Sequence, residues 1–111
     1  MPQLLVTKSF EFSASHFLTK YRGKCERLHG HNYKLEVSVI GEMREDDLVF
    51  DFVELDRIVK TKIIDVLDHT HLNDRFANPS AEVIAIWIWE QLEKNLNVFE
   101  IKLFETSSCF V

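Results

Sequence analysis

The sequence CERLHGHNY, residues 25–33, carries residue types at the spacing of a metal site. In an extended strand, residues i and i+2 point to the same face, so His29 and His31 would present their imidazoles together. Gly30 between them has no side chain on the opposite face. Two roles then fit Cys25. It is either a further ligand that closes a structural zinc site, or a reactive thiol beside an open catalytic one.

His16 is the third candidate ligand. It ends a stretch, residues 3–17, in which alternate positions share one face: Phe10, Phe12 and Ala14. If this stretch pairs with residues 29–43 through the loop 18–28, three imidazoles converge at the strand ends. Three histidines and one open position are typical of catalytic zinc, and imidazole ligands without a thiolate cluster favour Zn²⁺. Taken alone, His16 is more typical of a histidine satisfied in the core.

The segment LDHTHLN, residues 67–73, holds a candidate pair for proton transfer. The carboxylate of Asp68 is adjacent to His69, and a carboxylate that orients an imidazole allows it to relay a proton. The alternative is a turn-forming aspartate next to a solvated histidine. We expect His71 to be a surface residue.

Glu105 is a candidate for binding a substrate. It shares its parity with Phe99, Ile101 and Leu103, which places it at the end of an apolar strand face. An ionised carboxylate accepts two parallel hydrogen bonds from a guanidine-like edge. The alternative is a strand-end glutamate that turns to water.

The loop KYRGKCER, residues 20–27, is basic. Lys20, Arg22, Lys24 and Arg27 stand against Glu26 alone, in a chain of net charge −5. A local basic cluster on an acidic protein can bind an anion, although a solvated loop has the same composition. The overall charge argues against nucleic-acid binding.

The bulk composition indicates one ordinary globular domain, residues 1–111. The chain has 111 residues and is 46% hydrophobic, which suits a single core. It has no apolar run of membrane-spanning length and no signal-peptide pattern, so we predict a cytoplasmic protein with no membrane partner. Cys25 and Cys109 are too few for a disulfide framework, and a single bridge between them is the lesser alternative. We expect Cys109 to be structural.

The elements that must position these residues are two strands, two helices and two further strands. The strands are residues 3–17 and 29–43, and LVFDF (48–52) is a short extended piece. A helix starts at Asp51 with a capping box to Glu54. Its apolar stripe is Leu55, Ile58, Val59, Ile63, Val66 and Leu67.

The loop DHTHLNDRFANPS then leads to a second helix that starts near Pro79 or Ser80. The centre of this helix, VIAIWIWEQL, is apolar almost all round, which predicts cover from a neighbouring subunit. VFEIKLFET and SSCFV are the last strands. The order β-β-α-α-β-β predicts an α+β fold in which both helices cover one face of an antiparallel sheet.

Six of these segments resemble, in order and spacing, those of the 6-pyruvoyltetrahydropterin synthase family, from about residue 7 to residue 108. They are FSASH, CERLHGHNY, VFDFVELD, LDHTHLN, NPSAEVIAIWIWEQL and LFETSS. The animal-type enzymes have a longer spacing between the cysteine and the first histidine. The short spacing, Glu26 to Leu28, is similar to the 6-carboxy-5,6,7,8-tetrahydropterin synthases of the queuosine and 7-deazaguanine route. Some family members have glutamate where this chain has Cys25 and do different chemistry. The presence of Cys25 argues against that branch.

The resemblance implies a tunnelling fold, in which subunits join their sheets into a barrel as a trimer and two trimers stack. It implies Zn²⁺ on His16, His29 and His31, with Cys25 as the residue that takes a proton. The relay residues would come from a neighbouring subunit, and the remaining implied residues bind the pterin. These are Asp68 and His69 for the relay, Glu105 for the pterin edge and Thr106 beside it.

The implied substrate is 7,8-dihydroneopterin triphosphate, and the products are 6-carboxytetrahydropterin, acetaldehyde and triphosphate. From their charge and proximity, Lys24 and Arg27 are the best candidates to meet the triphosphate. Two alternatives remain. One is 6-pyruvoyltetrahydropterin formation from the same substrate. The other is a structural zinc module that binds a partner and uses Cys25 as a fourth ligand.

Overall fold

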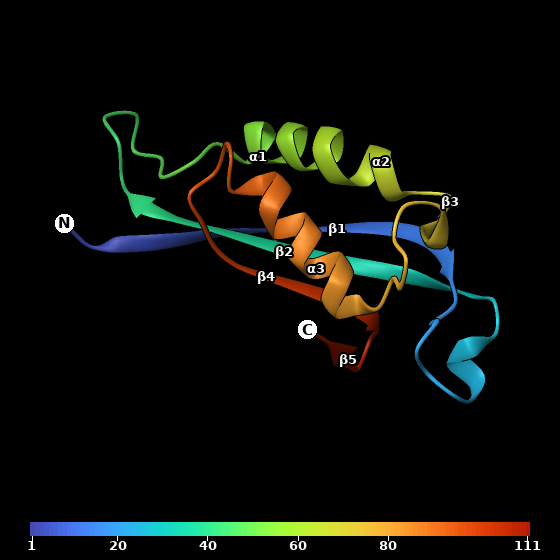
Figure 1. The fold of residues 1–111 in the computed structure, drawn as a ribbon. Helices are drawn as coiled ribbons and strands as arrows, with labels where there is room; N and C mark the ends of the chain where they lie inside the picture. The colour runs from blue at the N-terminus through green and yellow to red at the C-terminus, as the bar shows by residue number, and fades with distance from the viewer.

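Two long strands form the centre of a five-stranded sheet (Figure 1). The structure is a computed structural model that describes residues 1–111. β1 (Gln3–His16) and β2 (His29–Glu42) pair antiparallel along their whole length, so that His16 lies opposite His29. The sheet is completed by β3 (Thr70–His71), β4 (Val98–Thr106) and β5 (Cys109–Phe110), in the order β3-β1-β2-β4-β5.

Helices cover one face of this sheet. α1 (Phe52–Val59) continues through a π-helical turn, Lys60–Ile64, into α2 (Asp65–Leu67), and α3 (Ala81–Leu92) follows later in the chain. The core lies between these helices and the inward parity of the strands. It includes Phe10, Phe12, Tyr33, Leu35, Val37, Leu55, Ile63, Ile84, Ile88 and Leu103. The predicted α+β class is confirmed.

Side-chain caps determine where the helices begin. Asp51 accepts a hydrogen bond from the Val53 amide at 2.9 Å, as a helix N-cap does. The predicted capping box is wrong, because the Glu54 carboxylate pairs with Arg57. At α3, Ser80 accepts from the Val83 amide at 3.2 Å, so Pro79 lies just outside the helix.

The segment predicted as a loop between the helices contains regular structure. Thr70 and His71 form β3, which pairs parallel with Ala14 and Ser15, and a 3₁₀ turn follows at Leu72–Asp74. Two residues are too short to give a periodic signal, so the sequence predicted neither this strand nor its parallel direction. LVFDF is irregular up to the start of α1.

A β-bulge changes the parity of β4. Ser38 pairs with Glu100 whereas Val39 pairs with Val98, so Phe99 is the extra residue. Phe99 is consequently exposed, and Val98 packs against the core in its place. The predicted inward position of Phe99 is therefore wrong, but Ile101, Leu103 and Glu105 keep theirs.

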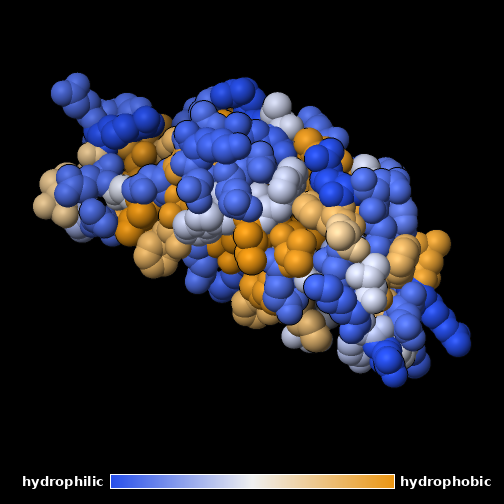
Figure 2. All heavy atoms as spheres, viewed as in Figure 1, coloured by the Kyte–Doolittle hydropathy of each residue, from blue (hydrophilic) through white to orange (hydrophobic).

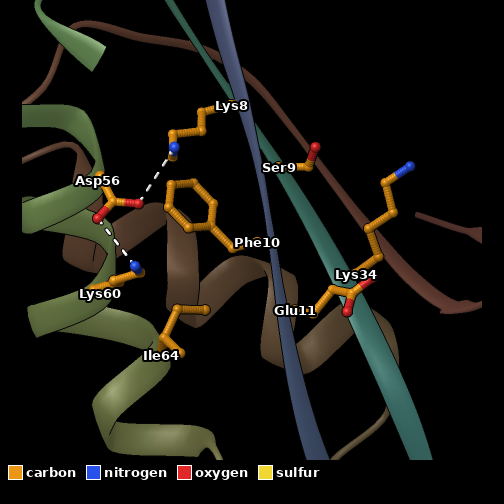
Figure 3. A pocket seen from close by; sticks show the side chains of 8 residues that line it. All are labelled: Lys8, Ser9, Phe10, Glu11, Lys34, Asp56, Lys60 and Ile64. Atoms are coloured by element: carbon orange, nitrogen blue, oxygen red, sulfur yellow. Dashed lines mark ion pairs between the residues drawn. The ribbon is translucent and has the colours of Figure 1, made fainter. Parts of the chain in front are cut away.

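A polar hollow separates α1 from β1 (Figure 3). The Asp56 carboxylate on α1 lies 3.4 Å from Lys8 Nζ on β1 and 3.1 Å from Lys60 Nζ. The hollow has no histidine or cysteine in its lining. Its charges link helix to strand and offer no metal-binding or nucleophilic set.

Part of the apolar surface of α3 is exposed in the single chain. Val83 and Ile86 remain 39% and 63% exposed, and apolar side chains gather near the middle of the face that carries α3 (Figure 2). The cover expected from a neighbouring subunit stays a prediction. None of the helices has the length and apolar character needed to cross a lipid bilayer.

Candidate metal centre and active site

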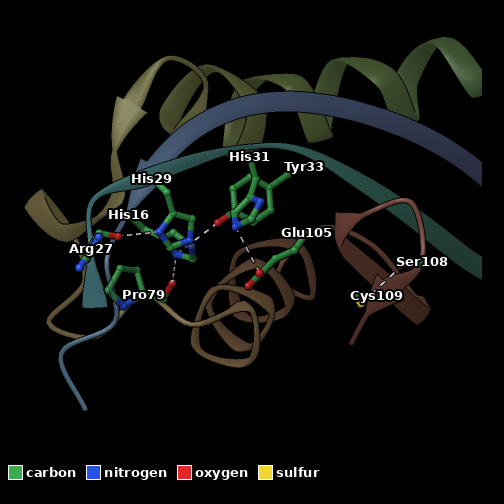
Figure 4. Close-up of polar contacts among 9 residues, drawn as sticks. All are labelled: His16, Arg27, His29, His31, Tyr33, Pro79, Glu105, Ser108 and Cys109. Carbon is green, nitrogen blue, oxygen red and sulfur yellow. Dashed lines mark hydrogen bonds and ion pairs between the residues drawn. The ribbon is translucent and has the colours of Figure 1, made fainter. Parts of the chain in front are cut away.

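Three histidine side chains converge where the pairing of β1 and β2 ends (Figure 4). His16 is buried, with 1% of its surface exposed, and His29 and His31 are half-buried. One ring nitrogen from each residue lies within 4.8 Å of the others. The register explains this grouping, because His16 faces His29 across the ladder and His31 follows on the same side of β2.

Backbone carbonyls determine which nitrogen of two rings is free. His16 Nδ1 lies 2.7 Å from the Pro79 carbonyl oxygen, and His29 Nδ1 lies 2.7 Å from that of Arg27. Since a carbonyl oxygen only accepts, both Nδ1 atoms carry the proton and donate it. In the neutral form of the two rings both Nε2 atoms carry lone pairs, and they lie 3.0 Å apart. Two lone pairs at that distance repel unless they share a cation.

His31 supplies a third free nitrogen. Its Nε2 is buried without a hydrogen-bond partner, although the Glu105 Oε2 atom lies 3.4 Å away. Burial lowers the pKa of His31, against the opposing effect of the Glu105 carboxylate, so the ring favours its neutral form. Three imidazoles that bring their Nε2 atoms together are the donor set that zinc takes. The residues present therefore fit Zn²⁺.

Tyr33 belongs to the same cluster and was not predicted as a functional residue. It is fully buried, and its hydroxyl lies 3.3 Å from His16 Nδ1. Burial, and secondarily Glu105, raise the pKa of Tyr33, so its hydroxyl stays protonated. The signal that could have found it is its parity with His29 and His31 on β2.

Cys25 lies outside the imidazole cluster. It sits in a 3₁₀ turn, Lys24–Glu26, and is half-buried. Its carbonyl accepts a hydrogen bond from the Leu18 amide at 2.7 Å. Cys25 and Cys109 are both free thiols, so the alternative of a bridge between them is wrong. Because the cluster contains three histidines without Cys25, the geometry counts against a closed four-ligand site.

The two basic residues nearest the cysteine, Lys24 and Arg27, are exposed on the same loop. The Arg27 backbone has a separate role, because its carbonyl orients His29.

Asp68 and His69 form a pair at the outer edge of β1. His69 Nδ1 lies 3.0 Å from Asp68 Oδ2, and 83% of the His69 side chain is exposed. Asp68 Oδ1 accepts from the Ser13 amide at 2.9 Å, and the His69 amide donates to the Ser13 carbonyl at 2.6 Å. The hydrogen bond from Ser13 is the largest cause that lowers the pKa of Asp68. His69 also has a positive φ of 59°, an uncommon conformation for a residue with a side chain.

This pair is not bonded to the metal cluster of its own chain. The hollow beside His69 is lined by Ser13, Ser15 and Asn32, whose parity is opposite to that of the inward-facing histidines, and also by His31. No hydrogen bond or ion pair joins Asp68 or His69 to Cys25 or to the three imidazoles. A single chain therefore does not bring the predicted relay to the predicted thiol.

The end of β4 brings one predicted residue to the cluster and leaves another outside it. Glu105 points inward beside His31, with 28% of its side chain exposed. Thr106 is exposed and pairs with Cys109 of β5.

Two minor expectations need correction. His71 is half-buried, because Nδ1 lies 3.0 Å from Ser15 Oγ and the ring stacks on Phe17. The thiol of Cys109 lies on the surface and fills no core position.

Comparisons with known proteins agree with this geometry. The sequence pattern of the 6-pyruvoyl tetrahydropterin synthase family matches residues 5–111. A putative 6-carboxy-5,6,7,8-tetrahydropterin synthase from Archaeoglobus fulgidus is 38% identical, over 93% of this chain and 89% of that protein. A 6-pyruvoyl tetrahydrobiopterin synthase from Dictyostelium discoideum is 36% identical, over 97% and 93%.

The fold agrees as well. The 6-pyruvoyl tetrahydropterin synthase of Caenorhabditis elegans superposes with a TM-score of 0.89 at 25% identity, over 100% of this chain and 94% of that one. The tunnelling-fold subunit is thereby confirmed. The chain belongs to the 6-pyruvoyl tetrahydropterin synthase family.

Proposed function

We propose that this protein is a zinc-dependent 6-carboxy-5,6,7,8-tetrahydropterin synthase that acts on 7,8-dihydroneopterin triphosphate in 7-deazaguanine biosynthesis. The observation that carries the proposal is the cluster of three imidazoles that bring one ring nitrogen each to a common point. A free thiol lies outside this cluster. The spacing of Cys25 and His29 favours the carboxy-forming branch. The relative from Archaeoglobus fulgidus has the same activity in its name.

The metal site would use His16, His29 and His31. Pro79 and Arg27 support it by holding two rings through their carbonyls, and such partners tune ligand orientation and basicity. A bound Zn²⁺ would supply Lewis-acid activation of the hydroxylated side chain of the substrate.

The organic chemistry falls to groups around the cluster. Cys25 acts as the base that accepts a proton, since it is free and lies outside the ligand set. Glu105 points inward next to His31 and anchors the amino and ring N–H edge of the pterin. Thr106 lies beside that anchor, and the exposed Lys24 and Arg27 contact the triphosphate.

A neighbouring subunit supplies Asp68 and His69. Within one chain this pair makes no hydrogen bond or ion pair with Cys25, so a complete site needs a second copy. The sheet has room for one, because β3 pairs only with Ala14 and Ser15 and leaves most of the outer edge of β1 without a strand beside it. We propose a trimer or a hexamer of two stacked trimers.

The test is to incubate zinc-loaded protein with 7,8-dihydroneopterin triphosphate and identify the products by mass spectrometry. Acetaldehyde together with 6-carboxytetrahydropterin is the expected result. Release of triphosphate with a 6-pyruvoyl product and no acetaldehyde would instead support the second candidate, which the relative from Dictyostelium discoideum favours by its name.

A pair of cysteine variants tests the role of the thiol. Cys25→Ala is expected to retain zinc and lose turnover, whereas Cys109→Ala, which removes the exposed thiol, retains both. If zinc content falls with Cys25, the thiol is a ligand and the structural zinc module is the better reading. X-ray absorption at the zinc K-edge gives the same decision, because sulfur in the first coordination shell would contradict an all-histidine site.

A further inference from the structure

Two asparagine side chains hold the strand that leads from His16 into the loop of Cys25. Beyond His16 the pairing of β1 and β2 ends, yet the backbone amides of residues 17–19 are all hydrogen-bonded. Asn73 Oδ1 accepts from the Phe17 amide at 2.9 Å, and Asn73 Nδ2 donates to the Phe17 carbonyl at 3.0 Å. One amide side chain thus replaces a neighbouring strand.

Asn78 repeats this contact two residues further along. Its Oδ1 accepts from the Thr19 amide at 2.9 Å, and the Thr19 hydroxyl donates to the Ala77 carbonyl at 3.4 Å. Phe17 and Thr19 therefore present one edge of an extended segment to the loop that precedes α3.

The residue between them presents the opposite edge. In extended backbone, successive N–H groups point to opposite sides, and the Leu18 amide donates to the Cys25 carbonyl at 2.7 Å. The amide contacts at residues 17 and 19 on one edge therefore set the direction of the single hydrogen bond from Leu18 to Cys25 on the other.

The loop before α3, which contains Asn73 and Asn78, also holds an imidazole of the metal cluster. Pro79 follows Asn78 directly, and its carbonyl accepts from His16 Nδ1. The segment Asn73–Pro79 is thus connected both to the histidine cluster and, through Leu18, to the backbone of Cys25.

We propose that Asn73 and Asn78 are positioning residues, which set the place of Cys25 relative to the imidazole cluster through the segment Phe17–Thr19. The catalytic part of this inference rests on the proposed role of Cys25 as a base. The positional part does not, because the accessibility of a thiol is measured without substrate.

The test uses zinc-loaded protein that carries Cys109→Ser, so that Cys25 is the only thiol. Asn78→Ala removes the acceptor for Thr19. We expect iodoacetamide to alkylate Cys25 about fivefold faster, which is the effect of one lost hydrogen bond on a local opening. Turnover should show a fall in kcat of about fivefold, while KM and zinc content stay unchanged.

Asn78→Asp is the conservative rescue, since a carboxylate oxygen still accepts from the Thr19 amide. Both the alkylation rate and kcat should return to the parent values. Asn73→Asp keeps the acceptor for the Phe17 amide and loses the donor to its carbonyl, so an intermediate alkylation rate is expected. These two variants decide the matter even if the alanine variant fails to fold.

Asn97→Ala is the matched control. Asn97 Nδ2 donates to the Ile40 carbonyl at 2.9 Å, an equivalent contact at the far end of β2. The Asn97→Ala variant should leave the alkylation rate of Cys25 and kcat unchanged. Equal alkylation of Cys25 in the parent and in Asn78→Ala, or no rescue by Asn78→Asp, would overturn the inference. Absence of turnover in the parent protein would overturn the proposed function and leave the alkylation comparison valid.

Discussion

Replacing His31 by leucine should weaken zinc binding and stabilise the metal-free protein at the same time. The His31 Nε2 atom is buried without a hydrogen-bond partner, and such an atom costs about 1–3 kcal/mol. Leucine has a similar volume and no polar atom, and Glu105, which loses its neighbour, is exposed enough to meet water. We expect the free energy of unfolding of the metal-free variant to rise by about 1 kcal/mol.

The loss of zinc affinity follows from the number of ligands. Four-ligand structural zinc sites bind with about 10–16 kcal/mol, so one ligand contributes roughly 2.5–4 kcal/mol. The dissociation constant of His31→Leu should therefore rise by about two to three orders of magnitude.

His16→Leu is the matched comparison. It should lose zinc affinity by a similar factor, but His16 Nδ1 also satisfies the Pro79 carbonyl. Its loss leaves that acceptor without its partner, and the metal-free variant should be less stable by about 1–3 kcal/mol.

Two measurements check this contrast. Zinc affinity is measured by competition with a chromophoric chelator, and metal-free stability by urea denaturation in the presence of EDTA. If His31→Leu destabilises the metal-free protein as much as His16→Leu does, His31 has a structural partner and the reasoning from its unsatisfied nitrogen is refuted. Unchanged zinc affinity in His31→Leu would refute its assignment as a ligand.

Three further predictions concern the surroundings of the site. Burial raises the pKa of Tyr33, so its neutral form stabilises the fold fully below pH 10.0 and less as the pH rises above that value. The measurement is absorbance at 295 nm in a Tyr21→Phe background, where Tyr33 is the remaining phenol. It should ionise at higher pH in the folded protein than in the urea-unfolded chain. Ser80→Ala should lower the free energy of unfolding by about 1 kcal/mol in denaturant titrations, because the Val83 amide loses its cap, and an unchanged midpoint would contradict that role. Leu103→Ala should lower it by about 2–5 kcal/mol, since the side chain is fully buried between sheet and helices; a loss below 1 kcal/mol would show a core that collapses around the gap.

Local spacing predicted much of the fold. Strand parity is a property of the backbone itself, so the alternation through His29, His31 and Tyr33 was enough to predict a shared face. The helix starts at Asp51 and Ser80 could be predicted because capping is a contact within three residues. The apolar stripe of α1 likewise follows from helical period.

Tertiary contacts decided the details that local patterns do not encode. A two-residue strand such as β3 exists only because β1 offers it an edge. The bulge that exposes Phe99 arises from the pairing of β4 with β2. His71 is half-buried because Ser15 and Phe17 happen to lie beside it.

For the site, the sequence by itself determined which residues could be ligands, because residue type and parity are local. Only the tertiary structure decided which nitrogen of the His16 and His29 rings is free, because that depends on the carbonyls of Pro79 and Arg27. The Pro79 carbonyl is 63 residues away from the ring it holds. The tertiary structure also decided that Asp68 and His69 make no hydrogen bond or ion pair with Cys25 in one chain. Their position depends on how the segment after α2 meets the edge of β1, which is a long-range contact and leaves no periodic mark in the sequence.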